Sequence, residues 1–297
     1  MRIRMLVSLT AVTLFVLSAA ALAGQPVNRI TILYDAFGKS ASLKKDWGFS
    51  ALVEYGGKRI LFDTGNNADI FAQNVKALSV DLKQLDFVVI SHRHGDHTSG
   101  LSYLLSINPS VKIYVPKETF GVFGSALPGT FYRKDESLPG YMRYYDGSPP
   151  EKITSGTLWP GANFVWVDSL TEVAPGISLI STVSQTPGTL ELRELSLAIK
   201  SPKGVILGVG CSHPGVEKIL EASTAIDKHV YLLFGGLHLV TMPDPDIARL
   251  ATALHDHWKI DRMAPGHCTG EPAFAVFHKA FGDQYVYAGL GSVIDLP

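Results

Sequence analysis

Short runs of apolar residues separated by turn residues dominate the first part of the chain. Residues 30–33 and 51–55 have the composition of strands, and residues 58–63 follow across Gly56-Gly57, a pair typical of a tight hairpin turn. The continuous apolar run at residues 87–90 indicates a strand that is buried on both faces. The amino-terminal half is therefore expected to open with an antiparallel meander.

Helical periodicity appears between these strands and again after them. Residues 67–78 repeat apolar positions at helical spacing behind Asn66 or Asn67, either of which would cap a helix. A short helix at residues 99–107 and a strand at residues 111–115 follow. The second half continues with expected strands at residues 164–167, 177–182, 195–200, 205–209, 230–234 and 262–264 and helices at residues 216–222, 247–258 and 272–281. This order predicts the α/β class, as an αββα sandwich in which helices cover the outer faces of two mixed sheets.

Residues 116–161 break the pattern, because proline and glycine recur there and neither period is sustained. A stretch of that length without regular structure is often a binding loop or lid. We expect it to cover the functional site, with aromatic rings and cationic groups that contact a flat or anionic substrate. The alternative is that the aromatic rings pack among themselves as a satellite core. The residues concerned are Phe120, Phe123, Phe131, Tyr132, Tyr141, Tyr144, Tyr145, Trp159, Arg133, Lys134 and Arg143.

The amino terminus has the features of a targeting segment. Arg2 and Arg4 form a basic start, a largely apolar stretch follows, and Ala21-Leu22-Ala23 offers small residues for cleavage. Residues 1–23 are therefore predicted to be a signal peptide and residues 24–297 a single mature domain. A membrane anchor is the alternative, because the apolar stretch is nearly long enough to span a bilayer. Since no later segment is apolar enough to cross, we expect a periplasmic or secreted protein without stable membrane insertion after cleavage.

Composition narrows the classes of partner. The 297 residues are 46% hydrophobic and 18% charged, which suits a globular protein with a substantial core. The formal net charge of −1 provides no basic excess for neutralising phosphates, so we expect no nucleic-acid partner. Two cysteines, Cys211 and Cys268, are too few for a disulfide scaffold. A small-molecule partner remains.

The strongest chemical signal is the segment His92-Arg93-His94-Gly95-Asp96-His97, which follows the predicted buried strand. Residues two apart in an extended segment point the same way, so His92 and His94 can converge on one ion. Gly95 permits a bend that turns Asp96 and His97 toward a second position nearby. Imidazole and carboxylate are ligands that suit zinc and, less selectively, manganese or iron. Capping of a helix by Asp96 is the alternative role for this polar segment.

These residues match the HxHxDH motif of the metallo-β-lactamase superfamily, which the chain resembles from about residue 29 to its end. Asp63 in Leu61-Phe62-Asp63-Thr64-Gly65 matches the superfamily's first motif, an acid that fixes the tautomers of metal-binding histidines. Further matches are Gly210-Cys211-Ser212-His213-Pro214-Gly215, Gly235-Gly236-Leu237-His238-Leu239 and Ala264-Pro265-Gly266-His267-Cys268-Thr269-Gly270. Within the superfamily, these segments are similar to those of the dihydropterin-type ribofuranosylaminobenzene phosphate synthases and related hydrolases.

The resemblance implies ligands for two metal ions, but this chain differs from the superfamily pattern at two of the ligand positions. Better-known members carry a metal-bridging aspartate where this chain has Cys211, and their preceding histidine has no counterpart here. His213 is therefore the candidate for the missing ligand of the first ion, with His92 and His94. His267 matches the last metal-binding histidine and is assigned to the second ion with Asp96 and His97. Cys211 is either a thiolate ligand or bridge, or a buried structural thiol.

The roles of His238 and of the two cysteines have alternatives, and a second histidine pair has the same spacing. His238 is a ligand, a donor of a proton or hydrogen bond to the substrate, or a core histidine. A disulfide between Cys211 and Cys268 is an alternative, and it would compete with metal binding by Cys211. His255 and His257 repeat the HxH spacing, but on a helix they are about 200° apart and cannot share an ion.

A dinuclear site activates water as hydroxide and polarises the group under attack, so hydrolysis needs no side-chain nucleophile. We therefore expect a metal-dependent hydrolase of a small ester, lactone or phosphoester, with two divalent ions, zinc before manganese or iron. Asp96 and His238 are the candidate catalytic residues. The alternatives are a di-iron oxidoreductase on the same fold, which usually has a glutamate where His94 stands, and a non-catalytic metal- or ligand-binding protein. Fold analogy does not choose the substrate.

Overall fold

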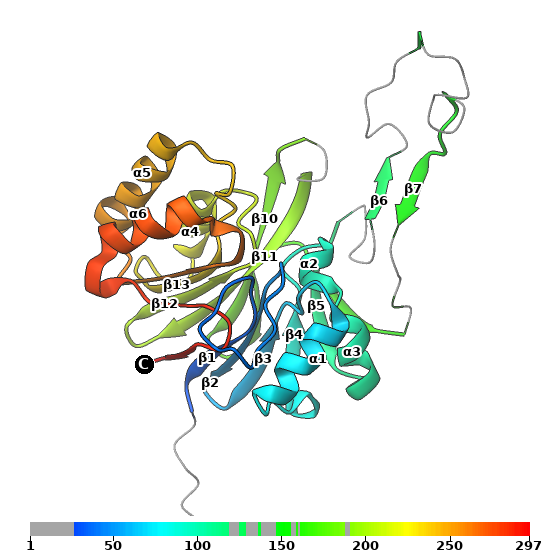
Figure 1. Ribbon diagram of the computed structural model, residues 1–297, viewed down its shortest axis with the longest axis horizontal. Coiled ribbons are helices and arrows are strands. Elements are labelled where there is room, and N and C mark those ends of the chain that lie inside the picture. The colour runs from blue at the N-terminus through cyan, green and yellow to red at the C-terminus, as the bar shows by residue number, and fades with distance from the viewer. Residues whose placement is uncertain are drawn as a thin grey trace, which may run out of the picture.

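The structure is a computed structural model, and it describes residues 27–118, 125–128, 136–137, 147–155, 159, 161–187 and 191–297. The predicted signal peptide and most of the predicted cover at residues 116–161 lie outside the described residues. Two mixed sheets lie face to face, with helices on both outer sides, as Figure 1 shows. The predicted αββα sandwich is confirmed.

Within the described residues the first sheet has seven strands in the order β15-β1-β2-β3-β4-β5-β8, and the second has six in the order β14-β13-β12-β11-β10-β9. The first consists of β1 (Arg29–Tyr34), β2 (Ser50–Tyr55), β3 (Lys58–Phe62), β4 (Phe87–Val89), β5 (Lys112–Pro116), β8 (Asn163–Val167) and β15 (Val293–Asp295). The second consists of β9 (Thr171–Ala174), β10 (Ile177–Gln185), β11 (Glu191–Ser201), β12 (Gly204–Val209), β13 (Val230–Gly236) and β14 (Arg262–Gly266). A separate antiparallel pair is formed by β6 (Ser125–Pro128) and β7 (Lys152–Ser155).

The helices divide between the two outer faces (Figure 1). The α-helices are α1 (Ala68–Ala77), α2 (Gly95–Thr98), α3 (Leu101–Ile107), α4 (Val216–Ser223), α5 (Asp244–Thr252) and α6 (Glu271–Phe281). Short 3₁₀ turns occur at η1 (Leu82–Gln84), η6 (His267–Thr269) and η7 (Gly282–Gln284), and one π-helical turn at η5 (Ala253–His257). The cyan helices α1 and α3 cover the first sheet, and α4, α5 and α6 cover the second.

Each sheet buries both of its faces, which explains the long apolar runs in the central strands. A core between the two sheets includes Phe62, Leu197 and Phe234, all at most 1% exposed. Separate apolar clusters fill the spaces between each sheet and its helices. As expected, Asn67 caps α1, because its side-chain oxygen accepts hydrogen bonds from the backbone N–H groups of Asp69 and Ile70.

Most element boundaries lie within a few residues of the expected ones, and the differences have local causes. The expected helix at residues 247–258 begins earlier, at Asp244, because Pro245 fits the first helical turn, and it ends in the π-helical turn. Strands β9 and β15 were not expected, because four and three residues are too few to show a period. No helix among the described residues is long and apolar enough to span a membrane.

Candidate metal centre

The candidate residues come from loops at the carboxyl ends of neighbouring strands. Strands β3, β4 and β5 run parallel in the first sheet, and β12, β13 and β14 run parallel in the second. The carboxyl ends of parallel strands meet at one edge, where open α/β sheets bind their ligands. The histidine loop after β4 therefore faces the loops after β12, β13 and β14 (Figure 1).

The first predicted ligand set, His92, His94 and His213, is assembled in the structure. Ligand nitrogens of the three side chains lie within 4.8 Å of one another. His92 Nε2 lies 3.1 Å from His94 Nδ1. Burial lowers the pKa of His213 to about 3, helped by the neighbouring His238 and His94, and burial with the nearby His97 also lowers the pKa of His92. Both rings are therefore neutral, which is the form that binds metal.

The second predicted set, Asp96, His97 and His267, is also assembled. Asp96 Oδ2 lies 3.4 Å from His267 Nε2 and 3.8 Å from His97 Nε2. Burial alone would raise the pKa of Asp96, but the charges of His97 and His267 outweigh it and hold that pKa well below its usual range. Burial would lower the pKa of His267, but Cys268 and Asp96 outweigh it and raise that pKa to about 10.

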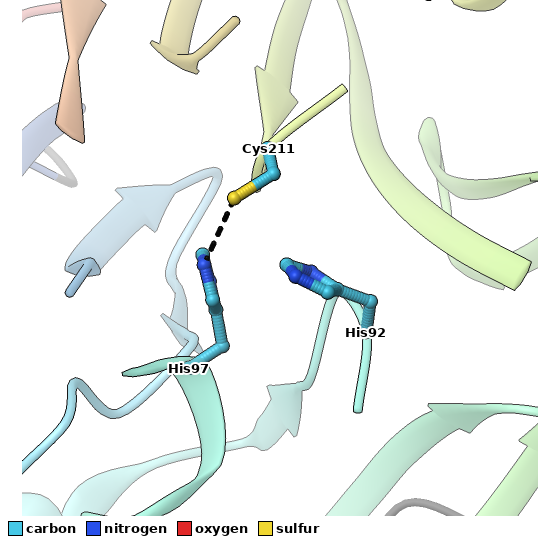
Figure 2. A group of neighbouring side chains, drawn as sticks. All are labelled: His92, His97 and Cys211. Atoms are coloured by element: carbon cyan, nitrogen blue, oxygen red, sulfur yellow. Dashed lines mark hydrogen bonds between the residues drawn. The ribbon is translucent and has the colours of Figure 1, made fainter. Parts of the chain in front are cut away.

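Cys211 lies between the two sets at the end of β12. Figure 2 shows its side chain and those of His92 and His97 pointing toward one another from facing loops. The Cys211 sulfur lies 3.2 Å from His97 Nε2, and the side chain is 2% exposed. Burial, followed by Cys268, raises the pKa of the Cys211 thiol well above its usual range. The position suits a bridging ligand, which stays a prediction.

Asp63 holds the histidine loop from beneath. One carboxylate oxygen accepts a hydrogen bond from the Ser91 backbone N–H at 2.7 Å, and the other accepts one from Ser91 Oγ at 2.7 Å. The second oxygen also lies 2.7 Å from His97 Nδ1. A proton on that nitrogen leaves His97 Nε2 as the ligand atom that faces the site. Asp63 thus lies where its predicted role requires.

Two buried acids that the sequence analysis did not single out support the later loops. Glu194 accepts hydrogen bonds from the backbone N–H groups of Cys211, Ser212 and His213 at 2.7–2.9 Å. Asp35 accepts one from the His267 N–H at 2.9 Å. Burial raises the pKa of each carboxyl to about 7. In the sequence, each acid could have been noticed only as a charged residue within or directly after an apolar strand.

Backbone strain is concentrated in these loops. Asp63, Ser212, His238 and His267 all have positive φ, between 46° and 60°. Each such residue costs about 1–3 kcal/mol and persists only where the surroundings fix it. A Cβ at Gly210 would come within 2.2 Å of Ser91 Oγ, so the strand behind Cys211 must approach the histidine loop without a side chain. The fold thus maintains an unfavourable local geometry around the site.

His238 and Cys268 adjoin the two sets, His238 beside His213 and Cys268 beside Cys211. The two cysteines are free thiols with their sulfurs 3.3 Å apart, so the alternative disulfide is not formed in this structure. His238 and His213 line a cavity of about 260 Å³ together with Ser212, Leu237 and Met242. His255 instead lies 2.6 Å from the carboxylate of its neighbour Asp256 on an exposed surface. The second HxH pair is thus outside the centre, as expected.

The donor set fits divalent metal ions. Both ring nitrogens of His213 and Nδ1 of His238 are buried, and among the described residues they have no hydrogen-bond partner. An unpartnered buried imidazole is costly unless an ion or ligand satisfies it. The grouped imidazole, carboxylate and thiol atoms belong to the ligand types that zinc prefers.

Comparison with known proteins agrees with this geometry. The sequence profile described as Metallo-beta-lactamase superfamily matches residues 48–179. The chain is 29% identical over 286 residues to 7,8-dihydropterin-6-methyl-4-(beta-D-ribofuranosyl)-aminobenzene-5'-phosphate synthase of Methanocaldococcus jannaschii, covering 89% of this chain and 95% of that protein. Profile and relative agree in showing that the chain is similar to the metallo-β-lactamase superfamily.

Two solved structures share the fold. One is Tm1679, a metal-dependent hydrolase of the beta-lactamase superfamily, with a TM-score of 0.70 and 23% identity, covering 91% of this chain and 99% of that one. The other is a diphosphatase from the PhnP family, with a TM-score of 0.51 and 15% identity, covering 90% and 96%. At these identities the likeness concerns the fold alone.

Proposed function

We propose that this protein is a metal-dependent hydrolase that uses a dinuclear centre to attack a small ester, lactone or phosphoester. One observation carries the proposal: two complete three-residue ligand sets lie beside each other, with Cys211 next to both. His92, His94 and His213 would hold the first ion, and Asp96, His97 and His267 the second. Zinc fits this donor set, with manganese or iron as alternatives.

Two divalent ions bound there would supply Lewis acidity and lower the pKa of water at the centre toward neutrality. The protein's own part is to keep the ligands in place and in the right protonation state. Asp63 fixes the His97 tautomer through Nδ1, and Glu194 fixes the loop that carries Cys211 and His213. These contacts leave the ligand nitrogens oriented toward the centre before substrate arrives.

Asp96 and His238 are the residues we assign to proton handling. The pKa of Asp96 is lowered, so its carboxylate carries no proton at neutral pH, and the resemblance to the superfamily is what assigns it a part in proton transfer during turnover. His238 lines the cavity beside His213, with ring centroids 4.4 Å apart, and its ring is placed to contact the substrate. It would donate a proton or hydrogen bond to the leaving group.

The cavity favours a small substrate. A volume of about 260 Å³ admits a compact organic molecule, and Val216, Leu237, Leu239 and Met242 give it an apolar wall. The formal net charge of −1 is consistent with a small-molecule substrate rather than a nucleic acid. The relatives include a phosphate synthase and a diphosphatase, which supports trying phosphate-containing compounds first.

A single mature domain exported to the periplasm or medium remains part of this proposal.

A panel assay tests the function. Purified protein is assayed with zinc, manganese and iron against esters, lactones and phosphodiesters, alongside elemental analysis. We expect turnover that disappears with a chelator and returns with one of the ions. Oxygen consumption without hydrolysis would indicate the di-iron oxidoreductase instead, and bound metal without any turnover would indicate a binding protein. Absence of metal and of metal uptake would refute the proposal.

A further inference from the structure

Cys268 has no role in the two ligand sets, yet it lies beside the centre. Its sulfur is 3.3 Å from the Cys211 sulfur, and both side chains are at most 2% exposed. The backbone N–H of His238 donates a hydrogen bond to the Cys268 sulfur at 3.2 Å. A ring nitrogen of His238 and the two sulfurs all lie within 4.8 Å of one another. Two thiols and one imidazole are thus grouped in a buried corner.

The fold builds this corner from three adjacent strands. Cys211 follows β12, His238 follows β13 and Cys268 lies just after β14, and these strands pair in parallel. A Cβ at Gly236 would come within 2.9 Å of the Cys268 sulfur, so the strand between the two cysteines leaves room for that sulfur. His238, which has a positive φ, brings a ring nitrogen within 4.8 Å of both sulfurs. The grouping therefore depends on strained and crowded backbone positions.

The chemistry of this corner differs from that of the two sets beside it. Thiolates are soft ligands that select zinc, copper(I) or cadmium, whereas carboxylate and imidazole also accept manganese. Two thiolates balance the charge of a divalent ion, which reduces the desolvation cost of burying that ion. Three protein ligands leave a fourth coordination site of the ion open. Because His238 lines the cavity, the ion would lie next to that cavity.

We propose that Cys211, Cys268 and His238 form a third metal position, adjoining the two predicted ones, that takes a thiophilic divalent ion. Any proton that the two sulfurs still hold is lost to solvent when the ion binds. His238 holds the ion through one nitrogen and keeps the other for the cavity. The inference concerns metal binding and does not depend on the hydrolysis proposed above.

Cadmium and manganese distinguish this position from the others. Reduced, metal-free protein is titrated in parallel with Cd²⁺ and Mn²⁺, and bound ions per chain are measured together with the ultraviolet absorption of sulfur-to-cadmium charge transfer. Cd²⁺ is expected to occupy one position more per chain than Mn²⁺. Cys268→Ser should remove that extra ion and, with it, the charge-transfer absorption that arises at this position.

Two variants serve as comparisons. His238→Ala should weaken binding of the extra cadmium ion while the two thiols remain. His255→Ala, on the exposed surface, is the matched histidine control and should bind cadmium like the unaltered protein. A thiol assay on the reduced protein should find two free thiols before titration and fewer accessible to reagent afterwards.

Several outcomes would overturn the proposal. Equal cadmium and manganese stoichiometry, or unchanged absorption in Cys268→Ser, would make Cys268 only a hydrogen-bond partner of Cys211. Rapid formation of a Cys211–Cys268 disulfide that prevents cadmium uptake would make the pair a redox couple instead. If Cys268→Ser does not fold, cadmium NMR of the unaltered protein decides, because its chemical shift reports the bound sulfurs. A two-sulfur resonance supports the position, and its absence refutes it.

Discussion

The two predicted ligand sets differ in their electrostatic surroundings although they lie side by side. The set His92, His94 and His213 contains only imidazoles, and the pKa values of His92 and His213 are lowered, mainly by burial. The set Asp96, His97 and His267 contains a carboxylate, and Asp63 lies directly behind His97. The pKa values of His97 and His267 are raised despite their burial, because these acids and Cys268 favour the charged rings.

This difference means that two neighbouring metal positions, both with ligands from the histidine loop, differ in the protonation of their ligands. In the first set, His92 and His213 offer neutral nitrogens and need no proton release before an ion binds. The second set holds a negative charge that attracts a cation but also retains protons, which an incoming ion must displace. We therefore expect filling of the first position to depend less on pH than filling of the second, which competes with protons.

Removing one ligand from each set should have the largest effect. His94→Ala and His267→Ala should each abolish activity with the fold retained, because neither side chain belongs to the apolar clusters of the core. Each variant should lose about one ion per chain, from a different position. The loss of affinity should exceed the roughly 10–100-fold typical of outer-shell partners. Elemental analysis and circular dichroism check this.

His255→Ala is the control for these two variants. Its side chain is exposed and paired with Asp256, so activity and metal content should stay close to those of the unaltered protein. Damage from His255→Ala as severe as that from His94→Ala would show that the ligand assignment is wrong.

Asp63→Asn should affect the second position selectively. The substitution keeps the size of the side chain but removes the charge that binds the proton on His97 Nδ1. We expect about 10–100-fold weaker metal binding there and little change at the first position. Titration with a competing chelator measures both affinities. Equal weakening at the two positions would mean that Asp63 supports the whole loop rather than His97.

The pH dependence of metal uptake should separate the positions. Because the pKa of His267 is raised to about 10, its ring is protonated at neutral pH, and binding an ion releases that proton. Affinity at the second position should therefore fall about tenfold per pH unit as pH decreases below that pKa, for each proton displaced. His213, with a pKa of about 3, should add no slope above that pH. Parallel slopes at both positions would contradict the comparison.

Among the ligand substitutions, Cys211→Asp should have the smallest effect on the metal content of the two predicted ligand sets. A carboxylate restores the more usual superfamily pattern, so a ligand role predicts folded protein that keeps its metal. In the metal-free form the same carboxylate is buried beside His97 and close to the Glu194 carboxylate, so the thermal stability of the protein should drop and recover on metal addition. Gross misfolding with metal present would assign Cys211 a structural role.

The sequence predicted the fold and the central residues because both have strong local signals. Three histidines and an aspartate within six residues directly after a buried strand identify a ligand loop without any tertiary information. The supporting acids could not be predicted in the same way. Glu194 lies 17–19 residues before the backbone groups it binds, and Asp35 lies 232 residues from His267. Such partners are defined only when the sheets assemble.

The second cysteine illustrates the same limit. Cys268 follows a predicted ligand in the sequence, and the spacing alone allowed a disulfide with Cys211. In the structure the sulfurs lie 3.3 Å apart as free thiols, and the register of β12, β13 and β14 brings His238 beside them. That register is a tertiary property, so the three-residue grouping was not predictable from any one segment.

An anomalous difference map recorded at the zinc edge, from crystals of zinc-reconstituted protein, tests the central claim most directly. The account predicts one peak among His92, His94 and His213 and a second among Asp96, His97 and His267, apart from any ion bound by Cys211, Cys268 and His238. A map with no peak in one of these two sets, at saturating zinc and neutral pH, would contradict the dinuclear centre.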